Sequence, residues 1–219
     1  MSFSTERIIE DVFKKEDIKV QKSLSKYLNL LFKWHDISNI VSSSDKEYVI
    51  RREIYDSYQL NKYLTGNAYS DIGTGGGIPG IIISILNPNK KVILIDRKST
   101  FIDFLILAKE DLGLNNIEVI QKDVLKPQVS LTTDTVLLKN FSNKIISKMN
   151  FEKKFTYLMT LIKKSKQVSK VYMLTGSPVL ELSKECFKEF NISTYVIPSP
   201  FFETNRVVAE VKFENTIYS

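Results

Sequence analysis

Cysteine and histidine are nearly absent from this chain, which holds one of each, Cys186 and His35. A single cysteine cannot form an internal disulfide, and the two residues are too few for a structural or catalytic zinc site, so we expect no metal. Long apolar runs are also missing. Residues 81–86 are far too few to cross a bilayer, and the N-terminus lacks the apolar stretch of a signal peptide. These absences predict a cytoplasmic protein without a membrane anchor.

Charged residues are plentiful and unbalanced. Lysine and arginine number 31 against 25 aspartates and glutamates, which gives a net charge of +6 and a pI of about 9.1. Such an excess suits a phosphate-bearing partner such as RNA, and it suits a lysine-rich solvated surface equally well. The 219 residues, 43% of them hydrophobic, are enough for one α/β domain with a modest extension. No long exposed apolar stripe is evident, so we expect a monomer.

Two patterns divide the chain. Residues 1–66 carry apolar residues at helical spacing, and we expect a helical extension packed on the core. From residue 67 to 219 short apolar strands alternate with helices, which predicts a doubly wound, mostly parallel, Rossmann-like sheet in one domain. A final antiparallel strand pair matches the way class I methyltransferases close their sheet. The expected strands are residues 68–72, 92–95, 117–120, 135–138, 171–174, 193–197 and 207–213, and a long helical pattern covers about 144–164.

Five of the eight glycines stand in one loop, residues 71–80, which follows the first strand and opens a helix. Gly73 and Gly75 permit a positive φ and leave no Cβ in the way of a ligand that approaches the backbone. Pro79 fits the first turn of the helix, where no N–H is needed. Because glycine raises the entropy of the unfolded chain, five glycines used only for packing would be costly, and we expect the loop to hold a cofactor.

The residues around this loop distinguish two classes of cofactor. Asp71, which ends the first strand, suits the ammonium group of S-adenosylmethionine and would repel the pyrophosphate of a dinucleotide. Asp96 ends the second strand and can accept both ribose hydroxyls of either cofactor. Asp123, Val124 and Leu125 follow the third strand, where an adenine is expected. A methyltransferase that uses S-adenosylmethionine is therefore predicted, with a NAD-dependent oxidoreductase as the alternative.

Several stretches follow a family pattern. The glycine loop ends in Gly77-Ile78-Pro79-Gly80, an ending that is unusual among methyltransferases. Residues 31–34, 52–57 and 206–208 match further parts of the pattern. Through these residues, and over about residues 24–211, the chain resembles the bacterial 16S ribosomal RNA guanine-N7 methyltransferases, also called glucose-inhibited division protein B. The resemblance implies methyl transfer to N7 of a guanine, with 16S ribosomal RNA or the small ribosomal subunit as the partner.

The same resemblance implies where the site lies. Asp96 would hold the ribose, and Asp56 would lie near the mouth of the pocket. The implied cofactor contacts are Gly73, Ile78, Val124, Leu125 and Lys139.

The chain also departs from the family's pattern. At each departure a basic or ionisable residue of the family is replaced in this chain. Glu53 replaces a histidine, Thr100 and Phe101 replace a basic pair, Lys139 replaces an arginine, and Thr175 replaces a lysine. They leave open two alternatives: a relative of the family that acts on another target, and a non-catalytic relative that only binds RNA.

The chemistry of the target atom decides what else the site needs. Guanine N7 carries a lone pair and no proton, so methyl transfer requires positioning and no general base. Lys139 and Asp56 are expected at the reacting end, where Lys139 would donate to the base edge or to the cofactor carboxylate. Cys186 lies on an apolar helical stripe and is expected to be a core residue rather than a nucleophile. Phe141 and the loop of residues 198–202 offer rings that could stack on a looped-out base.

Overall fold

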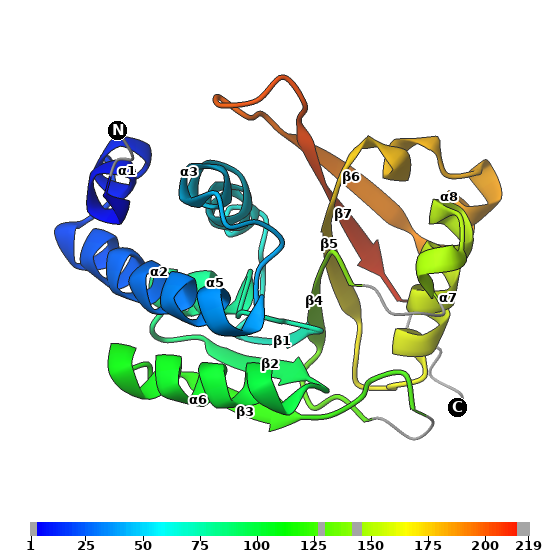
Figure 1. The fold of residues 1–219 in the computed structure, drawn as a ribbon. Helices are drawn as coiled ribbons and strands as arrows, with labels where there is room; N and C mark the ends of the chain where they lie inside the picture. The colour runs from blue at the N-terminus through cyan, green and yellow to red at the C-terminus, as the bar shows by residue number, and fades with distance from the viewer. Residues whose placement is uncertain (1–3, 127–129, 142–145, 214–219) are drawn as a thin grey trace.

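A mixed sheet runs through the middle of the molecule (Figure 1). The computed structural model describes residues 4–126, 130–141 and 146–213. Within these residues seven strands pair in the order β3-β2-β1-β4-β5-β7-β6. The first five pair in parallel, and β7 is antiparallel to both β5 and β6. The strands are β1 (Ala68–Ile72), β2 (Lys91–Asp96), β3 (Ile117–Gln121), β4 (Thr135–Lys139), β5 (Lys170–Thr175), β6 (Ile192–Ile197) and β7 (Arg206–Lys212).

Each predicted strand is confirmed to within one residue at either end. The central strands are continuous apolar runs because helices cover both of their faces; β2, for example, is buried from Val92 to Asp96. The predicted antiparallel pair at the C-terminus is also confirmed. The strand order reverses between β1 and β4, and in such sheets a ligand binds outside the carboxyl ends of the strands at that point. The glycine loop leaves β1 there.

Helices form layers on both faces of the sheet. On one face α5 and α6 contact the strands, and α2 lies across both helices; α7 and α8 cover the other face, on the right of Figure 1. Buried side chains of α1, α2 and α4 join the same core cluster as those of α5 and α6. The helical extension therefore shares a core with the sheet, and its treatment as a separate unit up to residue 66 stays a prediction.

The helices have the following bounds. Among the described residues they are α1 (Thr5–Val12), α2 (Ile18–Ser38), α3 (Lys46–Tyr48), the π-helix η1 (Val49–Ile54), α4 (Tyr55–Leu60), α5 (Gly80–Leu86), α6 (Ser99–Leu112), the 3₁₀ turns η2 (Ile146–Lys148) and η3 (Ser177–Glu181), α7 (Phe151–Lys163) and α8 (Lys184–Phe190). None of the helices in this part of the chain is both long and apolar enough to span a membrane.

The helices differ from the prediction at three points. Within the helical pattern of residues 1–66, the π-helix η1 and the first turn of α4 carry Arg52, Glu53 and Asp56 into the interior although all three side chains are charged. The pattern expected over residues 144–164 is not one helix. Its start lies outside the described residues, and α7 begins afresh because the Asn150 side chain caps it by accepting from the Lys153 amide. Pro79 directly precedes α5 instead of lying in its first turn.

Candidate functional site

The glycine loop is held together by the carboxylate that precedes it. Asp71 Oδ2 accepts from the hydroxyl of Thr74 at 2.6 Å and from the amide of Gly80 at 2.8 Å, so one oxygen joins the two ends of the loop. The side chain is almost fully buried, and burial raises the pKa of Asp71 to about 7. Asp71 therefore faces the loop itself, and it does not line the pocket that the loop borders.

Most glycines of the loop are needed for close packing. A Cβ on Gly80 would lie 2.2 Å from Leu94 Cδ2 and 2.7 Å from Asp71 Oδ2, and one on Gly76 would lie 2.9 Å from Leu31 Cδ1. Only Gly75, among the five, combines a positive φ of +57° with open space around the missing Cβ. Gly76 and Gly80, which were not among the predicted cofactor contacts, therefore make room for the protein itself.

Gly73 has a neighbour that the sequence did not predict. A Cβ at this position would lie 2.3 Å from Cδ2 of Phe141, so the aromatic ring occupies the space that the glycine leaves. Gly73 has a φ of +67°, which other residues rarely adopt. The ring of Phe141 therefore covers this end of the loop.

A pocket of about 200 Å³ opens next to Gly75 at the carboxyl ends of the strands. Six of the predicted cofactor residues line it: Gly73, Gly75, Asp96, Asp123, Val124 and Leu125. Sequence reasoning missed five other lining residues as ligand contacts: Arg97, Lys98, Phe101, Lys122 and Asn140. Arg97 and Lys98 directly follow β2 and Lys122 directly follows β3, and this shared position at strand ends was the signal that could have found them.

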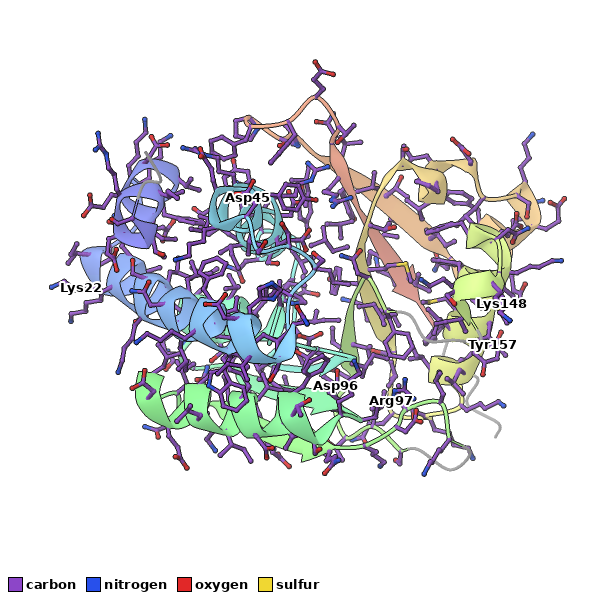
Figure 2. All side chains as sticks on the ribbon, in the orientation of Figure 1. Lys22, Asp45, Asp96, Arg97, Lys148 and Tyr157 are labelled. Carbon is purple, nitrogen blue, oxygen red and sulfur yellow. The ribbon has the colours of Figure 1, made fainter. Side chains whose placement is uncertain are left out.

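Asp96 is the best-fixed polar group of this pocket. Its Oδ2 accepts from the Gly75 amide and its Oδ1 from the Lys98 amide, each at 3.0 Å. Each carboxylate oxygen has two acceptor sites, so each retains capacity for a ligand donor. Figure 2 shows Asp96 beside Arg97 where β2 ends. The Asp123 carboxylate is fixed in a similar way by the Leu125 amide at 3.1 Å. The pocket thus offers two oriented carboxylates beside apolar Val124 and Leu125.

Lys139 and Asp56, predicted at the reacting end, belong to a buried charge network of Arg52, Glu53, Asp56, Lys139 and Arg206. The ammonium of Lys139 is paired with Glu53, and both side chains are 7% exposed. Arg206 Nε lies 3.1 Å from Asp56 Oδ2, and Arg52 Nε lies 3.5 Å from the same oxygen. Neither Lys139 nor Asp56 lines the pocket, and neither does Ile78.

The surroundings of the network shift two pKa values. Burial, followed by repulsion from Arg206 and Arg52, lowers the pKa of Lys139 to about 7. Burial also raises the pKa of Asp56, against the opposing effect of the same two arginines. Oδ1 of Asp56 has no hydrogen-bond partner within the described part of the chain. The network therefore sets three basic side chains against two carboxyl groups, and burial disfavours the charged forms of Lys139 and Asp56.

Comparison with known proteins identifies the family. A model described as GidB, rRNA small subunit methyltransferase G, matches residues 20–179, which is well over half of the chain. The chain belongs to this family. Two curated relatives named ribosomal RNA small subunit methyltransferase G, from Shewanella halifaxensis and Psychromonas ingrahamii, are 36% and 34% identical over 123 residues. The match covers 56% of this chain and about three fifths, 59%, of each relative.

Solved structures agree on the fold. The chain is similar to the precorrin-6y C5,15-methyltransferase of Geobacter metallireducens, with a TM-score of 0.51 at 9% sequence identity, over 80% of this chain and 92% of that one. At this identity the likeness concerns the fold alone, which is the class I methyltransferase fold that the sequence predicted.

Two of the departures from the family's pattern are partners in space. Glu53 stands where the family usually has histidine and Lys139 where it has arginine, and here the two form the ion pair described above. The carboxylate of Glu53 offsets the cost of burying the ammonium of Lys139. Thr175 ends β5, and the structure gives no reason for its replacement of a lysine.

The aromatic loop between β6 and β7 packs on the helical extension. The ring of Phe201 meets Tyr55 edge to face with centroids 5.2 Å apart, and the guanidinium of Arg52 lies 5.1 Å from the centroid of Phe202. Arg52 also donates to the carbonyl oxygen of Thr204 at 2.7 Å. These contacts already engage both rings of the loop of residues 198–202, which the sequence offered for base stacking together with Phe141. The prediction that Cys186 is a core residue is confirmed, since it is 5% exposed in α8.

Proposed function

We propose that the chain is an S-adenosylmethionine-dependent methyltransferase that methylates N7 of a guanine in 16S ribosomal RNA. The observation that carries the proposal is the carboxylate of Asp96, which two backbone amides hold beside the open face of Gly75. Family membership and the names of the curated relatives support the same reaction and the same substrate. Neither the pocket nor the relatives favour an oxidoreductase.

The residues of the pocket fit this cofactor. Asp96 can accept hydrogen bonds from two vicinal hydroxyls of a ribose, because both of its oxygens are fixed and each retains an acceptor site. Phe101, Val124 and Leu125 supply apolar surface for an adenine, and the fixed carboxylate of Asp123 lies beside them. When bound, S-adenosylmethionine supplies a methyl group on a sulfonium centre. The protein's task is to orient that centre and the base.

The buried charge network suits a reaction that needs no proton transfer by the enzyme. Guanine N7 has a lone pair and no proton, so no side chain has to act as a base. Lys139 is engaged by Glu53, and its position at the end of β4, next to Asn140 and Phe141 of the pocket, suits a role in fixing this strand end. We propose that Lys139 and Asp56 position the pocket wall.

The proposal extends to the partner and the setting. We expect the substrate to be 16S ribosomal RNA, either free or in the small ribosomal subunit. The monomeric state and the cytoplasmic location stay predictions from the sequence.

Methylation of purified small ribosomal subunits, and separately of free 16S ribosomal RNA, tests the proposal. Labelled S-adenosylmethionine is supplied and any label is mapped to its base. We expect label at a guanine N7. A protein that binds the cofactor in a calorimeter and labels neither substrate would contradict the ribosomal assignment, and a protein that does not bind the cofactor would contradict the methyltransferase.

A further inference from the structure

A chain of connected depressions leads from the candidate pocket across the surface of α7. One depression of about 440 Å³ shares Arg97, Lys98 and Lys122 with the pocket and extends to Lys126. Lys126 also lines a mainly apolar depression of about 500 Å³ against α7, and Lys164 is the other cation in its lining. Through Tyr157 this depression joins a third, which Lys153 borders. We call this surface the basic trough and define it by Arg97, Lys98, Lys122, Lys126, Lys153 and Lys164.

Within the described part of the chain, the cations of the basic trough have no carboxylate partners. None of the six forms an ion pair with any residue that the structure describes, and all except the half-buried Lys122 are exposed. Two exposed lysines elsewhere do have such partners: Lys26 lies 3.2 Å from Asp111, and Lys91 lies 2.7 Å from Glu118. Lys122 donates to the Ser130 carbonyl oxygen at 3.3 Å, and the Lys98 ammonium lies 4.6 Å from the centroid of the Phe101 ring. These neutral partners leave the positive charge of the trough available to a ligand.

The acidic residues of the same surface already accept hydrogen bonds from other groups of the protein. Asp96 and Asp123 accept from backbone amides, and Glu152 accepts from the hydroxyl of Ser183. Their charges reduce the potential of the trough, but their positions are fixed by the protein. The groups that can reach a ligand are the lysine ammoniums, because each is carried on a long and flexible side chain.

The helix α7 presents its part of the trough along one face. Lys153, Tyr157 and Lys164 are separated by 4 and 7 residues, and at 100° per residue the three side chains fall within about 40° of one another. The rise of about 1.5 Å per residue places Lys153 and Lys164 roughly 16 Å apart, which is the span of a few nucleotides. Tyr157, 38% exposed, lies between them and offers a ring on which a base can stack.

We propose that the basic trough binds the phosphate backbone of the RNA strand next to the target guanine, an inference that rests on the proposed function. A polyanion requires a row of unpaired cations that leads to the reacting site, and the trough supplies one. The strand would leave the pocket past Lys122 and Lys126 and continue along α7. Lys126, Lys153 and Lys164 belong to the trough and do not line the cofactor pocket, so they separate RNA binding from cofactor binding.

The triple variant K126Q/K153Q/K164Q tests this inference. The matched control is K14Q/K15Q/K22Q, which removes three exposed and unpaired lysines from the opposite end of the molecule, where Figure 2 labels Lys22. Dissociation constants for a 16S ribosomal RNA fragment are measured between low and moderate salt, together with S-adenosylhomocysteine binding. We expect the test variant to bind RNA about ten- to a hundredfold more weakly at ~0.1 M salt, with a salt slope reduced by about 2. Cofactor affinity and kcat at saturating RNA should stay at wild-type values.

The outcomes separate the two proposals. If the test and control variants bind RNA equally well while the wild type methylates guanine N7, the basic trough is wrong and the proposed function stands. If the wild type neither binds nor methylates the RNA, both proposals are wrong. If the test variant loses only its binding to vesicles that contain phosphatidylserine, the trough faces an anionic membrane surface and the RNA inference is overturned.

Discussion

Asp96 combines two tasks that are difficult to separate from sequence. Its oxygens accept hydrogen bonds from the amides of Gly75 and Lys98, and the same carboxylate lines the pocket. The carboxylate thus closes the glycine loop onto the end of β2 and leaves acceptor capacity for a diol. A neutral amide has one acceptor oxygen, and its NH₂ group would face one of the two amides.

Asp96→Asn is expected to weaken S-adenosylhomocysteine binding by at least tenfold in a calorimetric titration. Loss of a charge-assisted acceptor for the ribose accounts for about 1.5–3 kcal/mol. Asp103→Asn, an exposed position on α6, is the control and should bind normally. Equal affinities for both variants would remove Asp96 from the ribose site.

Asp71 makes the stability of the fold depend on pH. Burial raises its pKa from 3.8 to about 7, so the folded state holds the proton more tightly than the unfolded state does. The stability contributed by this proton is complete below about pH 3.8 and is lost as the pH rises through 7. Asn at this position keeps an oxygen for Thr74 and Gly80 and does not titrate.

The free energies of unfolding of the wild type and Asp71→Asn should therefore converge or cross as the pH rises. Relative to the variant, we expect the wild type to lose about 1.4 kcal/mol for each unit by which its pKa is raised, over the range from about pH 4 to 7. Urea denaturation at a series of pH values measures the difference. A difference that is constant over this range would show that the carboxyl titrates normally in the folded protein.

The side chains at strand ends show which parts of this site could be predicted from the sequence. Asp96 and Asp123 were predicted because a parallel strand delivers the residue that follows it to the ligand edge of the sheet. The roles of Gly76 and Gly80 were missed, because their neighbours, Leu31 and Leu94, come from other elements. A loop sequence alone does not indicate whether a missing Cβ makes room for a ligand or for the protein.

Among the elements, η1 is the one that joins distant parts of the chain. It presents Arg52 to the loop between β6 and β7, and Glu53 to the end of β4. These contacts bridge 152 and 86 residues of sequence. The helical spacing of apolar residues over residues 1–66 predicted helices in this region. It could not predict the π-turn or the inward charges, since both depend on partners far along the chain.

Glu53→Gln is expected to destabilise the protein by about 3–5 kcal/mol, because it leaves Lys139 buried beside Arg206 without a full anionic partner. The double variant with Lys139→Met should recover much of this loss, since it removes the unpaired cation. A double-mutant cycle on the free energies of unfolding measures the coupling between the two residues.

The exposed pair of Lys91 and Glu118 provides the comparison for this cycle. Its atoms are 2.7 Å apart, but the side chains are 57% and 46% exposed, so its coupling should be below about 1 kcal/mol. A coupling for Glu53 and Lys139 no larger than that of this surface pair would contradict the view that the buried network fixes the end of β4.

For the molecule as a whole, the strand order brings the ends of β1, β2, β3 and β4 to one edge, and the candidate pocket lies there. The sequence was sufficient to predict the sheet, because buried parallel strands are continuous apolar runs and the crossover rules allow few strand orders. The extension was expected to pack on the core, and its helices share a core with α5 and α6. Which helices it would meet could not be predicted, because no local pattern records those contacts.

This architecture serves both dinucleotide enzymes and methyltransferases, so ligand-linked stability distinguishes them. A ligand that binds only the folded state at a hundred times its dissociation constant stabilises it by about 2.7 kcal/mol. For a chain of this length we expect S-adenosylhomocysteine at that concentration to raise the Tm by roughly 5–10 °C, and NAD at the same concentration to leave it unchanged. Asp96→Asn at an equal ligand concentration should show a smaller shift than the wild type, which ties the effect to the pocket. A larger shift with NAD would instead assign the fixed carboxylate of Asp96 to a dinucleotide ribose, and the proposed methyl transfer would fail with it.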